Sequence, residues 1–195
     1  MSYRTQQNQV IFHKRIGILG GVSPESTIRY YQHIVRKHRD LFGDLSYPEM
    51  IIYSVSLQRF QDWIAEDNWS KITPGLIDGV RSRHAAGADF ALLAANVLHF
   101  VFNEVREKSP IPLISIIEAT AASIRKEGVH KVGLLGTRFT MERPFYIDGL
   151  ARHGIEAITP ANRSDRDYVH HVAEEELTRG LINAESDVLT TQVCP

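Results

Sequence analysis

The sequence predicts an α/β fold in which parallel sheets are flanked by helices. Short apolar segments rich in Ile, Val, Leu and Ala alternate along the chain with longer segments of helical period. The connections are only a few residues long, which favours parallel strands joined by crossover helices. Strands buried on both faces should be almost continuously apolar, and the segments FALLAA (90–95) and VGLLG (132–136) meet that expectation.

The first strand and the helix after it have the clearest boundaries. The strand RIGILGG ends in the glycine pair at 20–21. Ser23 can cap the next helix, Pro24 fits its first turn, and Gly43 is a typical stop. We therefore expect a strand at 15–21 and a helix at 23–43.

The same alternation continues to the end of the chain. The helix at 69–87 contains Pro74, which marks either its first turn or a kink. The further strands are expected at 49–56, 88–95, 111–115, 131–137 and 155–159. The further helices are expected at 69–87, 99–109, 118–128, 143–154 and 165–179.

A faint internal repeat relates the segment 14–31 to the segment 130–146. Both place a glycine early in a strand, then a second glycine, a polar turn, and a helix with Glu and an aromatic pair. Either any two strand–helix units of this class look alike, or the chain folds into two related lobes. The second interpretation predicts a first lobe at 1–113, a second lobe at 114–195, and a ligand cleft between them.

The composition is that of an ordinary globular protein. The 195 residues are 43% hydrophobic and carry 22 basic and 23 acidic side chains, spread along the chain. We expect no nucleic-acid partner and no membrane span, and the polar start MSYRTQQNQV makes a cytoplasmic location the expectation. The one cysteine, Cys194, excludes an internal disulfide, and no metal-ligand spacing is present, so no metal is expected.

Ligands of open parallel sheets bind beyond the carboxyl ends of the strands. Helices follow these ends, and their first amides carry partial positive charge that favours a carboxylate or phosphate. The strand ends with polar or flexible residues are 20–23, 54–56, 96–99 and 136–140.

Several of these residues have a second interpretation. The glycines at 20–21 fit a tight turn as well as a binding loop, and Ser23 fits a helix cap better than a catalytic hydroxyl. Arg138 can clamp a carboxylate or lie on the surface, and His99 can pack or cap rather than react. The acidic run 174–176 predicts a solvated helix face.

Three motifs taken together resemble the aspartate/glutamate racemase family. They are LGGVSPEST (19–27), NVLH (96–99), and LLGTRFTM (134–141) followed by Tyr146. The resemblance covers about residues 14–180.

Family membership implies racemisation of a small amino acid or dicarboxylate without a cofactor, and commonly a homodimer. Two opposed cysteines exchange the α-proton, while turn amides and hydroxyls stabilise the charge on the carboxylate. By this resemblance the positions that bind substrate are Gly21, Ser23, Ser54, Asn96, Val97, His99, Thr137, Arg138, Thr140 and Tyr168.

The sequence departs from the family pattern at the critical positions. Ala95 stands where the first cysteine is expected, Val97 replaces a threonine, and Tyr168 stands near the place of a lysine. The second cysteine belongs to a late GCTE turn that this chain lacks, which leaves Cys194 as a weak candidate and indicates a C-terminally truncated member. We therefore expect an impaired racemase. The alternatives are a non-catalytic binder of an amino acid or carboxylate, and a remnant that only oligomerises.

Overall fold

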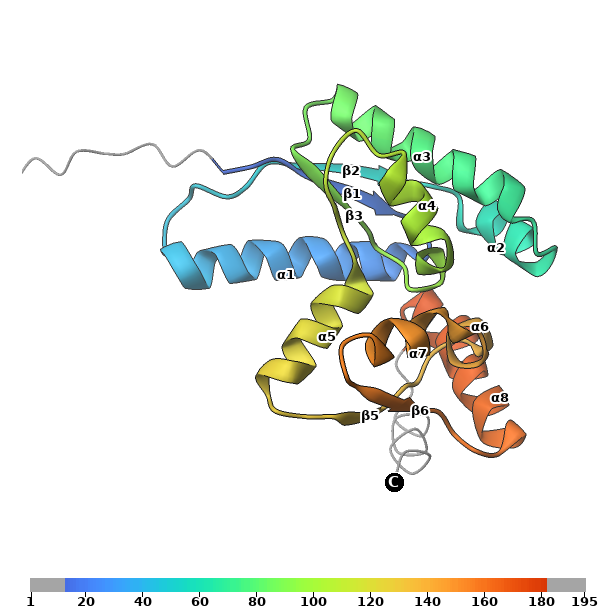
Figure 1. Cartoon of the computed structure of the whole chain (residues 1–195). Coiled ribbons are helices and arrows are strands. Elements are labelled where there is room, and N and C mark those ends of the chain that lie inside the picture. The colour runs from blue at the N-terminus through green and yellow to red at the C-terminus, as the bar shows by residue number, and fades with distance from the viewer. Residues whose placement is uncertain (1–12, 182–195) are drawn as a thin grey trace, which may run out of the picture.

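The N-terminal part of the chain forms a parallel four-stranded sheet. In the computed structural model, which describes residues 13–181, the strand order is β2-β1-β3-β4. Figure 1 labels the first three of these strands. The register pairs Ile18 with Ile52 on one side and with Leu92 on the other. The strands are β1 Ile16–Gly20, β2 Met50–Ser54, β3 Phe90–Leu93 and β4 Leu113–Ile114.

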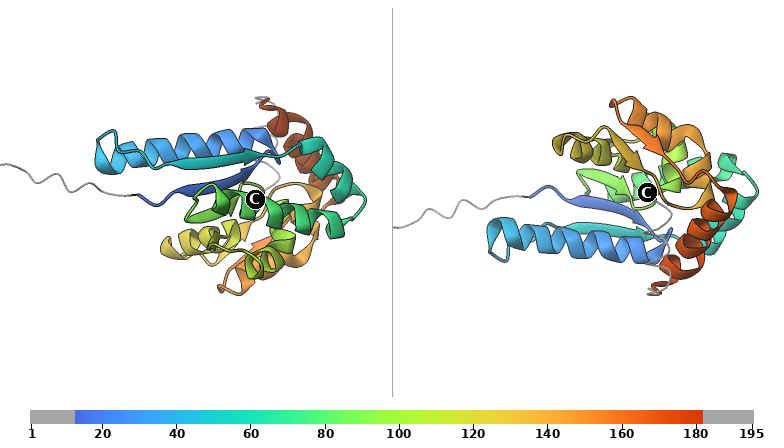
Figure 2. Two further views of the ribbon diagram at one scale, coloured as in Figure 1. Left: turned by 90° about the horizontal axis from the view of Figure 1, so that it is seen from above. Right: turned by 90° about the horizontal axis from the view of Figure 1, so that it is seen from below.

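Helices cover both faces of this sheet (Figure 2). On one face, Ile34 of α1 packs against a small core that contains Ile18 and Leu92. On the other, the larger core joins Leu76 of α3 to Leu19 and other buried residues. The helical segments of this part are α1 Pro24–Phe42, α2 Leu57–Ala65, α3 Trp69–Ala85, η1 Val97–Val101 and α4 Phe102–Glu107.

A second, two-stranded parallel sheet lies in the C-terminal part. It pairs β5 with β6, and its core contains Ile117, Leu134 and Leu150. Its elements are α5 Ile116–Lys126, β5 Lys131–Gly133, α6 Arg138–Glu142, α7 Pro144–Ala151, β6 Glu156–Ile158, α8 Arg163–His171, η2 Val172–Glu176 and η3 Leu177–Arg179. The predicted α/β class, with parallel sheets flanked by helices, is confirmed. Within residues 13–181 no helix is long and apolar enough to cross a bilayer.

The predicted lobe boundary at 113/114 falls inside β4. This strand pairs with β3, so it belongs to the first sheet. The chain then passes directly into α5 through Ser115, whose hydroxyl accepts the Glu118 N–H at 3.3 Å. The division into two lobes at this point stays a prediction.

The structure corrects several predicted helices. The helix α2 was not predicted; alone it is too short to be stable, and packing of Phe60 and Trp63 against the first core holds it. The predicted helix at 99–109 begins earlier, as the 3₁₀ segment η1. A separate short helix, α6, precedes the one predicted at 143–154, and the helix predicted at 165–179 ends in the π and 3₁₀ segments η2 and η3.

An aromatic cluster joins the two parts of the chain. The ring of Phe100 lies 4.6 Å from Trp69 and 5.4 Å from Phe139, between centroids. Arg143 adds an ion pair with Asp67 at 3.3 Å. Because Phe139 also lines the pocket described below, this cluster fixes one side of the pocket to α3 and η1, whose Trp69 and Phe100 pack against the first core.

Arg83 is the largest fully buried side chain in the described part of the molecule. It lies on α3, is 1% exposed, and its guanidinium carbon lies 5.0 Å from the centre of the Tyr53 ring. None of its three guanidinium nitrogens has a hydrogen-bond partner among residues 13–181. Burial lowers its pKa to about 10, because desolvation penalises the charged form.

Replacing Arg83 by methionine is therefore expected to stabilise the protein. The change keeps much of the aliphatic volume and removes an uncompensated charge, so the free energy of unfolding should rise by about 1–3 kcal/mol. Urea unfolding at pH 7 measures this. Arg81→Met, at an exposed position on the same helix, is the matched control and should change stability by less than about 0.5 kcal/mol. A less stable Arg83→Met variant would contradict this expectation and would show that the guanidinium contributes favourably to the folded state through its packing and its contact with the Tyr53 ring.

Candidate functional site

The first wall of the site is the turn that follows β1. Gly21 has φ +97°, and a Cβ atom there would lie 2.3 Å from the carbonyl oxygen of Val55, so only glycine fits. The Gly21 N–H donates to Thr27 Oγ1 at 2.9 Å. Ser26 Oγ donates to the carbonyl oxygen of Ala94 at 2.7 Å, which ties the turn to the end of β3.

Ser23 stands at the N-cap position of α1, as predicted. Its side chain, however, makes no capping hydrogen bond. A serine hydroxyl at a helix start usually accepts a backbone N–H, so this one is left available for another partner. Ser23 lines the pocket.

The second wall is the segment that follows β3. Ala95 lines the pocket and is 8% exposed, and Asn96 beside it is exposed and makes no capping hydrogen bond. His99 lies beneath this wall and is 5% exposed. Its Nδ1 lies 3.0 Å from the carbonyl oxygen of Ala95, and its Nε2 accepts the N–H of Ile116 at 2.9 Å.

The hydrogen bonds of His99 determine its protonation. An imidazole nitrogen that accepts an N–H carries no proton, so the proton lies on Nδ1 and is donated to Ala95. Burial lowers the pKa of His99 to about 4, although the hydrogen bond to Ala95 opposes the shift. His99 is therefore neutral at pH 7 and positions the wall that carries Ala95.

The third wall comes from the second sheet. Thr137 caps α6 and accepts the backbone N–H of Thr140 at 3.4 Å. Arg138 faces the pocket with part of its side chain, but its guanidinium donates to Asp167 Oδ1 at 2.8 Å. The positive charge of Arg138 is thus already paired.

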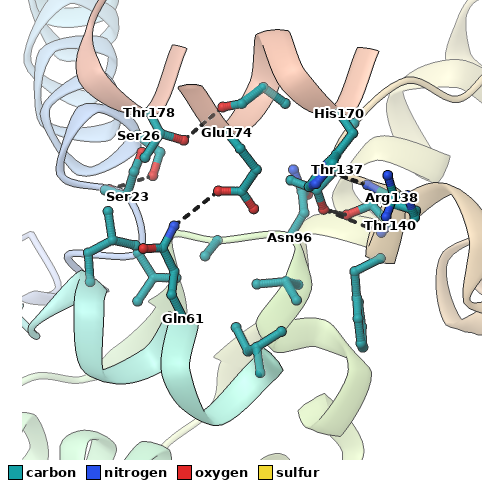
Figure 3. Close-up of a pocket in the computed structure, with 18 of the residues that line it drawn as sticks. Ser23, Ser26, Gln61, Asn96, Thr137, Arg138, Thr140, His170, Glu174 and Thr178 are labelled. Carbon is teal, nitrogen blue, oxygen red and sulfur yellow. Dashed lines mark hydrogen bonds between the residues drawn. The ribbon is translucent and has the colours of Figure 1, made fainter. Parts of the chain in front are cut away.

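The fourth wall is formed by α8, η2 and η3, with α2 opposite them (Figure 3). His170 Nδ1 accepts the backbone N–H of Arg138 at 3.3 Å. Glu174 points into the pocket, and its Oε2 accepts the side-chain N–H of Gln61 at 3.0 Å. This contact joins α2 to a segment 113 residues further along the chain.

The walls enclose a pocket of about 720 Å³. The predicted positions that line it are Ser23, Ala95, Asn96, Val97, Thr137, Arg138 and Thr140. Four other predicted positions are not among the lining residues: Gly21, Ser54, His99 and Tyr168. Ligand contact by these four stays a prediction, and Cys194 lies outside the described residues.

Sequence reasoning missed the residues supplied by α2 and by the C-terminal helical segment. The prediction that the run 174–176 is a solvated face is wrong for Glu174, which is half-buried and lines the pocket. A signal was present, because His170, Glu174 and Thr178 are spaced four apart, which places them on one helix face. Gln61 could not be found in this way, since α2 itself was not predicted.

The lining also contains Tyr30, whose pKa is raised by burial and by the neighbouring Tyr146. No group of three or more His, Cys, Asp or Glu residues within 13–181 is arranged to hold a metal ion. The pocket therefore offers hydroxyls, the amides of Gln61 and Asn96, the imidazole of His170, aliphatic surface, and the carboxylate of Glu174, which has no ion-pair partner among residues 13–181. Such a lining suits a small polar molecule with separate charged ends.

Comparison with known proteins shows which family the chain belongs to. Residues 19–192 match the Asp/Glu/hydantoin racemase family, which is most of the chain. The chain belongs to this family. The broad-specificity amino-acid racemase RacX of Bacillus subtilis is 31% identical over 147 residues, which cover 73% of this chain and 63% of RacX. The chain thus spans less than two thirds of that relative's length.

Solved structures of other racemase-family proteins have the same fold. A Yersinia pestis protein described as a candidate Asp/Glu racemase is 36% identical, with a TM-score of 0.83 over 93% of this chain and 79% of its own. An aspartate racemase homologue from Pyrococcus horikoshii is 37% identical, with a TM-score of 0.78 over 90% and 76%. The predicted membership in the racemase family is confirmed.

Proposed function

We propose that this chain holds a small amino acid in the pocket and that its proton transfer at the α-carbon is impaired. The observation that carries the proposal is the place of Ala95. It lines the pocket at the position where the racemase motif has its first cysteine.

The chemistry makes this substitution costly. The α-hydrogen of an amino acid is very weakly acidic, so removal requires a base held against it. A thiolate can act as that base, whereas the methyl group of Ala95 cannot. Loss of a general base typically costs about 10²–10⁴-fold in rate.

The polar groups that could hold the amino acid are still present. The side chains of Ser23 and Asn96 make no hydrogen bond within the described part of the chain, and both line the pocket. The hydroxyl-bearing Thr137, in the second part of the molecule, lines the same pocket. These groups support a proposal that the ligand carboxylate binds between the ends of β3 and β5.

A non-catalytic binder of an amino acid or carboxylate is the second candidate, and Ala95 favours it too. The two candidates differ in whether the bound amino acid exchanges its α-hydrogen. The cofactor-free mechanism, the homodimer and the cytoplasmic location inferred from the sequence belong to the same proposal. Light scattering after size-exclusion chromatography tests the homodimer.

Exchange of the α-hydrogen in D₂O, followed by proton NMR, separates these functions. Both enantiomers of aspartate, glutamate and lysine should be used, with calorimetric titration of the same ligands. We expect binding together with slow exchange, of roughly 0.001–0.1 s⁻¹, which is 10²–10⁴-fold below a typical turnover of about 10 s⁻¹. Binding with exchange at the rate of buffer alone would support the binder and overturn residual racemisation. Absence of binding would overturn both.

A further inference from the structure

We propose that Glu174 makes the pocket select amino acids with a positively charged side chain over the dicarboxylic amino acids. This inference rests on the proposed function, because it assigns the substrate class of the same pocket. Glu174 descends from η2 into the pocket, where Gln61 orients it (Figure 3).

Among residues 13–181, no basic side chain pairs with the carboxylate of Glu174. Its hydrogen-bond partner, Gln61, is a neutral amide. Within residues 13–181 it makes no ion pair, since no Lys, Arg or His nitrogen lies within 4.0 Å of it. The neighbouring Glu175, in contrast, is exposed and pairs with Arg179 at 2.6 Å.

The one guanidinium in the pocket lining is already paired. Arg138 donates to Asp167 at 2.8 Å, and Asp167 also lies 3.6 Å from Arg163. No lysine is among the lining residues. His170, the other basic residue of the lining, accepts the Arg138 backbone N–H through Nδ1. A ligand with a second carboxylate would therefore meet Glu174 with neither a lysine nor an unpaired guanidinium among the described lining residues to receive it, and like charges repel.

The surface around Gln61 suits the stem of a basic side chain. Leu57 and Ile64 of α2 line the pocket on either side of Gln61 along the helix, and Val22 lies in the same lining. An aliphatic stem packs on such a surface while its charged end reaches a polar partner. Glu174 supplies that partner, so lysine or ornithine fits both the apolar surface and the carboxylate.

Calorimetric titration with four L-amino acids tests the inference: lysine, ornithine, norleucine and glutamate. Norleucine has an aliphatic stem like that of lysine but no charge. A hydrogen-bonded ion pair of this kind changes affinity by about 10–100-fold. We expect lysine and ornithine to bind the full chain tighter than norleucine and glutamate by that factor.

Variants of two adjacent glutamates make the test specific. Glu174→Gln should reduce lysine affinity to that of norleucine, whereas Glu175→Gln, the matched control outside the pocket, should leave the preference intact. Glu174→Lys should reverse the preference in favour of glutamate. Equal binding of glutamate and lysine by the unaltered chain would overturn the inference. If Glu174→Gln lowered norleucine affinity by the same factor as lysine affinity, the inference would also be overturned, because the carboxylate would then contact the α-ammonium group that both ligands share. Failure of all four ligands to bind would instead overturn the proposed function, and the inference with it.

Discussion

Replacing His99 by leucine is expected to lower the free energy of unfolding by about 2–4 kcal/mol at pH 7. His99 is buried, and its ring bridges the carbonyl oxygen of Ala95 and the N–H of Ile116. Leucine fills similar space but leaves both backbone groups without a partner. Urea unfolding measures the loss, and His84→Leu is the control, because His84 is exposed on α3.

The pH dependence of the free energy of unfolding, measured for the unaltered protein and for His99→Leu, tests whether His99 is buried in its neutral form. The pKa of His99 is about 4 in the folded protein and about 6.5 in the unfolded chain. Between these pH values the unfolded chain binds a proton that the folded protein does not. The contribution of His99 to the free energy of unfolding is therefore fully present above pH 6.5 and is lost as the pH falls towards 4. The loss amounts to roughly 3 kcal/mol and is absent from His99→Leu. The difference between the two proteins should therefore shrink in acid. A difference that stays constant from pH 7 to 4 would refute the low pKa.

Replacing Ala95 by cysteine is expected to raise α-hydrogen exchange by about 10²–10⁴-fold without inverting the amino acid. Ala95 lines the pocket, so the thiol would face the pocket interior at the position that the proposed function assigns to the first cysteine of the racemase motif. A single base removes the proton from one face and returns a solvent deuteron to that same face. Exchange with retained chirality is the result.

Deuterium exchange by NMR and chiral chromatography of the same samples measure the two events separately. Ala95→Ser is the matched control, because its hydroxyl is close in size to the thiol but does not ionise near neutral pH. Inversion as fast as exchange in Ala95→Cys would contradict the expectation. It would mean that a second acid–base group faces the other side of the α-carbon.

The fold class was predictable because it depends on local patterns. The continuous apolar segment FALLAA requires burial on both faces, and short connections restrict such strands to a parallel arrangement. The helix α1 was also predictable, since Pro24 and Gly43 mark its ends and Gly43 adopts the left-handed conformation with φ 67°. The helix α2 was not, because packing against the first core rather than its own sequence stabilises it.

The site was predictable only where it follows the strand ends. Ser23 and Asn96 line the pocket because the ends of β1 and β3 meet at one edge of the first sheet, and Thr137 lines it from beyond the end of β5 in the second sheet. The position of Glu174 depends instead on how a distant helical segment packs against α2. No pattern among residues close together in the sequence predicts that contact.

The sequence by itself determined the parallel α/β architecture, the racemase motifs and the absence of a thiol at Ala95. Each of these depends on the identity and order of residues close together in the chain. Only the tertiary structure decided that His99 joins the end of β3 to the start of α5 and that Glu174 brings into the pocket a carboxylate with no ion-pair partner among residues 13–181. Burial and charge pairing arise between segments far apart in the sequence, so they exist only once the chain has folded.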